Sequence, residues 1–152
     1  MLVVFALLFQ PCGPLARTAC TCLQRSEPRT VSEARAALDA ADAVFSGEVV
    51  RTTLRRDSTR AATIRGDSAW FRYETLVATI AVREVWKGGV ADTVQVETPV
   101  QTTMCGADLE GGAYLIDGER TGASTFVTTK CSWTRPLSEA RALQALLRRA
   151  RS

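Results

Sequence analysis

The chain has 152 residues, of which 46% are hydrophobic, and its 19 Lys and Arg residues against 16 Asp and Glu residues give a formal net charge of +3. This length is typical of one domain, and so small a positive surplus does not indicate a protein that binds nucleic acid. His is absent, which excludes Ser-His and Cys-His nucleophile pairs and histidine-ligated zinc. An enzyme that uses carboxylates or Lys is still compatible with this composition, but the commonest proton-transfer residue is missing. We expect no enzymatic activity, no cofactor and no metal ion of its own.

The N-terminus carries the pattern of a secretory signal peptide. Residues 2–9 form an apolar run, LVVFALLF, which is much shorter than the ~20 residues that a membrane-spanning helix needs. Small residues follow at Ala16 and Ala19, as they do at a processing site. We predict a signal peptide over residues 1–19, although the same run also suits a buried first strand.

Cleavage after Ala19 makes Cys20 the first residue of the mature domain, residues 20–152. The expected location is outside the cell or in the periplasm, with no stable membrane span after cleavage. Lipoprotein anchoring at Cys20 is the weaker alternative, because Arg17-Thr18-Ala19 is a poor match to the apolar and small residues of such signals.

The mature domain retains four of the five cysteines, because Cys12 falls within the predicted signal; the four are Cys20, Cys22, Cys105 and Cys131. Disulfides are the default in an exported protein, and four cysteines can pair in three ways. A zinc site with four cysteine ligands is the alternative. It is disfavoured because the last two cysteines lie far apart and form no second closely spaced pair.

The first half of the mature domain predicts a helix followed by a strand. Residues 30–42 predict the helix, because Thr30 and Glu33 have capping-box spacing and the segment is rich in Ala. Residues 43–53 have strand composition, and Gly47 is expected at a bulge or a close approach of the backbone.

Residues 54–68 are rich in Arg and show no clear period, so we expect a solvated hairpin loop there, with a functional basic patch as the alternative. Strand composition and period-2 alternation predict further strands at residues 70–86, 93–98, 113–117 and 125–129. A last helix from about Ser138 presents an apolar face made of Leu143, Leu146, Leu147 and Ala150.

Five strands with one or two helices in about 130 residues predict a mainly β domain built on a small barrel. The residues expected in or near its core are Val44, Ile80, Val82, Val94, Val96, Leu115 and Val127. The tryptophans Trp70, Trp86 and Trp133 are further core candidates, with an exposed anchor as the alternative for Trp133.

Four sequence patches share their order and spacing with one known family. They are Cys20-Thr21-Cys22, residues 41–50 (ADAVFSGEVV), Val85-Trp86-Lys87-Gly88, and a last set of Cys105-Gly106, Leu109, Tyr114-Leu115-Ile116, Gly118, Cys131 and Leu137-Ser138. Over residues 20–138 they resemble the N-terminal inhibitory domain of the tissue inhibitors of metalloproteinases, a member of the netrin-like group of five-stranded OB barrels.

The resemblance implies a five-stranded OB-like (netrin-like) barrel with one or two packed helices, stapled by the disulfides Cys20–Cys105 and Cys22–Cys131. Some features of the family have no counterpart here, namely its third disulfide in this domain and its separate C-terminal subdomain. The loop after the first strand also differs in length and composition. These differences weaken the transfer of activity more than the transfer of fold.

The resemblance also implies a mechanism. In the family, the mature N-terminal Cys places its α-amine and its carbonyl oxygen on the catalytic zinc of a protease, in the open position that the attacking water would use. Carried over, Cys20 is the chelator, Thr21 points toward the specificity pocket and Cys22 is a second tether. The residues that flank this wedge are Thr102, Thr103, Met104 and Gly106.

Two other functions stay open. With Cys20 and Cys22 as structural staples only, the domain is a netrin-like protein-binding module without inhibitory activity. An enzyme would need a carboxylate pair such as Asp108 and Glu110, but these lead into Gly111-Gly112, where solvated turn carboxylates are expected. We expect a monomer with a protein partner, a zinc metallopeptidase in the most specific hypothesis, and no nucleic acid.

Overall fold

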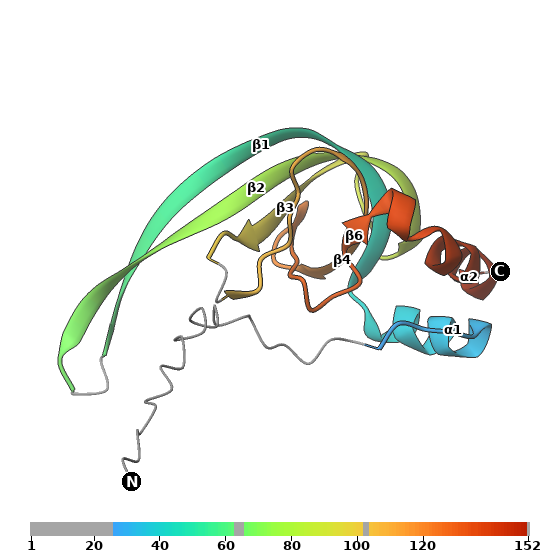
Figure 1. Ribbon diagram of the computed structural model, residues 1–152, viewed down its shortest axis with the longest axis horizontal. Coiled ribbons are helices and arrows are strands. Elements are labelled where there is room, and N and C mark those ends of the chain that lie inside the picture. The colour runs from blue at the N-terminus through green and yellow to red at the C-terminus, as the bar shows by residue number, and fades with distance from the viewer. Residues whose placement is uncertain (1–25, 63–65, 102–103, 152) are drawn as a thin grey trace, which may run out of the picture.

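A β-barrel, a layer of two helices and a long projecting pair of strands make up the fold (Figure 1). The computed structural model describes residues 26–62, 66–101 and 104–151. In chain order the elements are α1 (Val31–Ala40), β1 (Ala43–Ala62), β2 (Ser68–Lys87), β3 (Thr93–Pro99), β4 (Gly112–Arg120), β5 (Thr125–Val127), β6 (Arg135–Pro136), the short 3₁₀ helix η2 (Leu137–Glu139) and α2 (Arg141–Arg151).

Five strands close into a ring. Their order is β1, β2, β3, β5 and β4, and β4 pairs back onto β1 from Ala43 to Val49. β3 and β5 run parallel, whereas the other neighbours in the ring are antiparallel. The short β6 adds to β4. The predicted mainly β class and the five-stranded barrel are therefore confirmed.

The barrel interior is filled by apolar side chains from the five strands and from the segment before β4. Its buried members are Ala43, Phe45, Ala78, Ile80, Val94, Val96, Leu109, Tyr114, Ile116 and Phe126. The predicted core residues Ile80, Val94 and Val96 lie among them, and Val82 packs against them while only partly buried. Val127 is only half-buried.

Gly47 marks a bulge in β1, as expected from the sequence. The pairing of β1 with β2 shifts register between Ser46 and Gly47. A Cβ atom at Gly47 would overlap the Ile80 side chain and stand 2.6 Å from the carbonyl oxygen of Ala81. Glycine is required here because the neighbouring strand approaches too closely for a side chain.

The second apolar cluster lies between the barrel wall and the helices α1 and α2, which pack against each other (Figure 1). Val44 and Leu115 belong to this cluster, and their neighbours Phe45 and Ile116 point into the barrel. Val44 and Leu115 are thus buried, as predicted for residues in or near the barrel core, and they lie on the helix side of the barrel wall. Both strand faces are covered here, so both alternating sets are apolar.

The structure confirms both helices that the sequence predicts. Thr30 and Glu33 form the capping box, and the Glu33 amide donates to Thr30 Oγ1 at 3.1 Å. In α2, Leu143 and Leu147 are buried, whereas Leu146 is only partly buried against the same cluster. No helix in the described residues has the length and apolar character needed to cross a membrane.

Trp86 and Trp133 are both buried, as expected for core residues. The indole N–H of Trp133 donates to the carbonyl oxygen of Ser26 at 3.3 Å, which ties the chain before α1 to the helix layer. The alternative in which Trp133 is an exposed anchor is excluded by its burial.

The projecting strands differ from the sequence prediction. β1 and β2 continue far past the barrel, so most of the predicted loop over residues 54–68 is paired strand. Beyond Val49 on β1 and before Thr75 on β2, no third strand of the described chain joins the pair. We call residues 50–62 and 68–74 the ribbon; it arches away from the barrel in Figure 1.

The loop prediction was wrong because both faces of the ribbon are exposed, and the apolar alternation that marks a half-buried strand is absent. Polar side chains across the pair hold it instead. Arg56 Nε lies 2.8 Å from Glu74 Oε1, and Arg60 Nε lies 2.8 Å from Ser68 Oγ. Trp70, a predicted core residue, is 68% exposed because it lies on the ribbon, outside the barrel.

Candidate protein-binding site

Part of the predicted wedge and its flanks lies within the described residues. Met104, Cys105, Gly106 and Cys131 are described, whereas Cys20, Thr21, Cys22, Thr102 and Thr103 lie outside the described residues. The structure therefore places residues 100–101 and 104–111, which follow β3 and precede β4 and which we call the connector, and the loop that carries Cys131.

Cys105 occupies an unusual backbone conformation. Its φ is 57°, and it is the only residue other than glycine with a positive φ among the residues that the structure describes. Its carbonyl oxygen accepts a hydrogen bond from the amide of Lys130 at 2.8 Å. This bond brings the connector beside the loop that carries Cys131. Left-handed φ values in residues other than glycine concentrate at positions that the surrounding structure constrains.

Close packing against Pro99 explains why glycine follows Cys105 in the Cys-Gly patch. A Cβ atom at this position would overlap the carbonyl oxygen of Pro99 and stand 2.8 Å from its carbonyl carbon. The next amide, that of Ala107, donates to the buried Thr98 Oγ1 at 2.7 Å. The connector is thus pressed against the end of β3, with no space for a side chain at position 106.

A buried aspartate holds the loop that carries Cys131. Asp117, at the end of the apolar run in β4, accepts a hydrogen bond from the Trp133 amide at 3.3 Å. Its backbone amide donates to Thr134 Oγ1 at 3.0 Å, and its carbonyl accepts from Thr128 Oγ1 at 3.0 Å. Sequence reasoning did not single out Asp117, although a charge that directly follows AYLI in a strand is a usable signal.

An apolar hollow of about 540 Å³ opens between the ribbon and the connector. Its apolar lining comes from Leu54, Leu76, Pro99, Val100 and Leu109, and its charged residues are Asp108, Glu110 and Lys130. Lys130 Nζ lies 3.2 Å from the exposed Asp108 carboxylate. The carboxylates expected in a turn are therefore on the rim of a hollow, and Asp108 is neutralised by Lys130.

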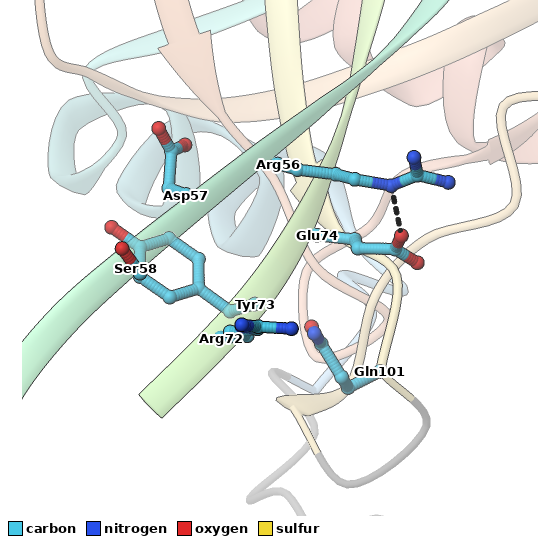
Figure 2. A pocket seen from close by; sticks show the side chains of 7 residues that line it. All are labelled: Arg56, Asp57, Ser58, Arg72, Tyr73, Glu74 and Gln101. Carbon is cyan, nitrogen blue, oxygen red and sulfur yellow. Dashed lines mark hydrogen bonds and ion pairs between the residues drawn. The ribbon is translucent and has the colours of Figure 1, made fainter. Parts of the chain in front are cut away.

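A second, polar hollow of about 650 Å³ lies further along the ribbon. Figure 2 shows Arg56, Glu74 and Arg72 extending toward the side where Gln101 lies, with Asp57 and Tyr73 on the opposite side of the strands. Arg56 and Glu74 form the ion pair described above.

The exposed large apolar side chains of the described residues gather on the same part of the molecule. They are Val50, Leu54, Trp70, Phe71, Val100 and Met104. All six belong to the ribbon or the connector, and none belongs to the helices or to β4. Trp70 and Phe71 are consecutive in β2 and therefore point to opposite faces, so exposed apolar side chains occur on both faces of the ribbon.

An ion pair lies on the side of the ribbon opposite Leu54. Arg55 makes a two-pronged contact with Glu97 of β3, at 2.7 and 3.0 Å, and also contacts Asp57 at 2.7 Å. Hydrogen bonds to Glu97 and then to Asp57 raise the pKa of Arg55. A bidentate ion pair holds its two side chains in a defined relative orientation. The pair between Arg55 and Glu97 therefore joins the start of the ribbon to β3 of the barrel.

The described residues contain no group of three or more His, Cys, Asp or Glu side chains arranged as metal ligands. What the arrangement provides is a hollowed, partly apolar surface beside the Cys-Gly step. Such a surface is suited to binding another protein.

The model of one family, described as Tissue inhibitor of metalloproteinase, matches residues 18–148. No curated protein sequence matches the chain. The family match extends over most of the chain and includes the barrel, the connector, the loop that carries Cys131 and α1. The chain belongs to the tissue inhibitor of metalloproteinase family.

Proposed function

We propose that the exported chain begins at Cys20 and inhibits a zinc metallopeptidase, with the α-amine and the carbonyl oxygen of Cys20 as ligands of the target's catalytic zinc. The observation that carries this proposal is the family match over residues 18–148, since that family is one of metalloproteinase inhibitors. The match reaches the segment in which Cys20-Thr21-Cys22 occurs.

The chemistry requires a free N-terminus. A catalytic zinc ion keeps one position open for water, and two donors from one residue displace that water by chelation. An amine nitrogen has a lone pair for the metal, whereas the nitrogen of a peptide bond has none available because of resonance. Cleavage directly before Cys20 is therefore part of the mechanism, and it places the protein in an exported, oxidising compartment.

The geometry around Cys105 supports the disulfides that would hold the wedge. Cys20 and Cys22 are separated by one residue, so in an extended chain they lie about 7 Å apart. Their partners must then lie close together as well, because the Cα atoms of a disulfide are about 5.5 Å apart. The hydrogen bond from Lys130 to Cys105 brings Cys105 beside the loop that carries Cys131.

Two tethers within three residues would make the wedge rigid, and rigidity lowers the entropy cost of binding. In this arrangement Thr21 enters the specificity pocket of the protease, and Cys22 is the second tether. Thr102, Thr103, Met104 and Gly106 flank the wedge. The half-exposed side chain of Met104 supports this role, because it is free to contact a partner.

A one-residue extension tests the proposal. The protein is exported with its own signal, and intact mass establishes whether Cys20 is the unmodified N-terminus. A second form carries one additional Ala before Cys20, which converts the coordinating amine into an amide. We expect the first form to inhibit members of a panel of zinc endopeptidases and the second to lose inhibition.

Circular dichroism and free-thiol measurement on both forms serve as controls for folding. Equal inhibition by the two forms, or a Cys20 that is lipid-modified or internal, contradicts chelation. Absence of inhibition across the panel by two folded forms favours the alternative, a netrin-like binding module without inhibitory activity.

A further inference from the structure

One face of the ribbon continues the interior face of the barrel. Residues paired across antiparallel strands share a face, and successive residues alternate. The pairs Leu54–Leu76, Arg56–Glu74, Ser58–Arg72 and Arg60–Trp70 therefore lie on the face to which the buried Ala78 and Ile80 belong. We call this the inner face of the ribbon.

The two hollows follow each other along the inner face. Leu54 and Leu76 line the apolar hollow, and their neighbours on that face, Arg56 and Glu74, line the polar one. At the junction the connector continues the pairing of β3 along the edge of β2, where the Val100 amide donates to the carbonyl oxygen of Glu74 at 2.9 Å. The two hollows thus form one trough, with the connector along its side.

The two ends of the trough differ in chemistry. At the barrel end, Leu54 and Val100 are 47% and 44% exposed over a floor that includes the fully buried Leu109. In the middle, Arg56 and Glu74 neutralise each other. At the outer end Arg72 is exposed and makes no ion pair with any carboxylate that the structure describes.

We propose that this trough binds an extended segment of the protein partner, which places an apolar side chain between Leu54, Leu76 and Val100 and a carboxylate on Arg72. Leu76 and Arg72 are four residues apart on one strand, which corresponds to about 13 Å. The occupant therefore carries its acidic residue four positions from its apolar residue. Trp70, exposed beyond Arg72 on the same face, extends the contact.

The identity of the partner rests on the proposed function: it is a metallopeptidase that presents such a segment next to its catalytic cleft. Binding of the segment itself needs neither the zinc ion nor the amine of Cys20. The two ideas are therefore separable by experiment.

Two capped peptides test the trough directly. One has the sequence Ser-Leu-Thr-Thr-Thr-Glu-Ser, and its matched control has Lys in place of Glu. Each is titrated into the isotope-labelled protein, and amide chemical shifts are followed by NMR. We expect the acidic peptide to shift Leu76, Val100 and Arg72 and to bind about two- to five-fold more tightly than the control, the range expected of an exposed ion pair. Equal affinities, or shifts confined to other surfaces, overturn the proposal.

Charge reversal on the ribbon sharpens the result. Arg72→Glu should reverse the preference, so that the Lys peptide binds more tightly. Arg51→Glu is the matched control. It changes the charge by the same amount, but Arg51 pairs with Thr79 and lies on the opposite face of the strands. It should leave the preference for the acidic peptide intact. An equal effect of the two substitutions would show that overall charge, and not the trough, decides binding.

The same two variants are compared in the protease panel. Weaker inhibition by Arg72→Glu than by Arg51→Glu supports the trough as a contact with the protease, and equal inhibition by both contradicts it. If no protease is inhibited while the acidic peptide is still preferred, the proposed function fails and the trough stands as a peptide site. If inhibition is strong but neither peptide binds, the trough proposal fails alone.

Discussion

Gly106 lies so close to Pro99 that any side chain at position 106 would overlap the Pro99 carbonyl oxygen. The hydrogen bond from the Ala107 amide to Thr98 Oγ1, at 2.7 Å, holds the same two segments together. The chain is therefore locked onto the end of β3 directly after Cys105. Any partner that contacts the Cys-Gly step meets a fixed surface.

Gly106→Ala should destabilise the protein by about 1–3 kcal/mol or more, because the added methyl group forces either the connector or the end of β3 to move. The measurement is the free energy of unfolding from urea denaturation. Gly89→Ala is the control, since a Cβ at Gly89 meets nothing within 4 Å; it should change stability by less than about 1 kcal/mol. Similar values for the two variants would contradict the close approach.

Leu147→Ala should cost about 2–5 kcal/mol, because Leu147 is fully buried between the helices and the barrel. Leu146→Ala, the adjacent and chemically identical change, should cost clearly less, since Leu146 is only partly buried. Denaturant midpoints of the two variants give the comparison. A larger loss for Leu146→Ala would mean that α2 is rotated about its axis relative to this structure.

The disulfides are predicted to be Cys20–Cys105 and Cys22–Cys131. Each closes a loop of more than eighty residues, for which the chain-entropy model gives roughly 4–5 kcal/mol as an upper figure. The loops overlap, so the two contributions do not add. Peptide mapping of exported protein without reduction is the measurement. Recovery of Cys20 joined to Cys22, or of free thiols, would refute the pairing.

Inhibition should weaken on acidification, because a protonated amine has no lone pair for zinc. Free α-amino groups titrate near 7.7–8.0, and zinc competes with the proton for the same lone pair, so the loss should occur below that range. Inhibition constants are measured against pH, with the uninhibited protease as the reference at each point. Potency that does not depend on pH would speak against the amine as a ligand.

The ion pair between Glu84 and Arg148 predicts a second pH effect, on stability. Hydrogen bonds from Arg148 lower the pKa of Glu84. A carboxyl whose folded pKa lies below its unfolded pKa stabilises the protein above the unfolded pKa, about 4.3, and loses this contribution as the pH falls through the folded pKa.

Glu84→Gln should therefore lower the free energy of unfolding at neutral pH and leave it unchanged at a pH below both values. Because Arg148 is exposed, the effect should be small and should decrease with salt. Glu110→Gln removes the same charge at an exposed position that forms no ion pair within the described residues; it is the control and should leave the free energy of unfolding at neutral pH unchanged. An equal loss at both pH values would contradict the ion pair.

Local patterns in the sequence were sufficient to predict the helices and strands that have a capping motif or a regular apolar alternation. The capping box of Thr30 and Glu33 placed the start of α1, and alternation through Ala78 and Ile80 placed the wall of the barrel. Both signals act within a few residues of the chain, so they do not depend on distant contacts. The order of patches along the chain also indicated the family that the comparison then showed.

The site itself depended on contacts between segments far apart in the sequence. The Cys-Gly patch was visible, but its meeting with the loop of Cys131 rests on the bond between Lys130 and Cys105, and its close approach rests on Pro99. Asp117 was missed because its hydrogen-bond partners, which include Trp133, only become neighbours after folding. No local pattern records such contacts.

A small β-barrel with two packed helices could be predicted from the sequence alone, because strand alternation and helix capping depend on residues that are neighbours in the chain. Three features became evident only from contacts across the whole fold: Arg55 to Arg60 form paired strand, Trp70 is exposed, and Val44 lies against the helices. In each case the deciding factor is which surface a strand face meets, whether solvent, helix or barrel interior. That depends on the arrangement of the whole fold, because the backbone of a strand has the same local conformation in all three environments.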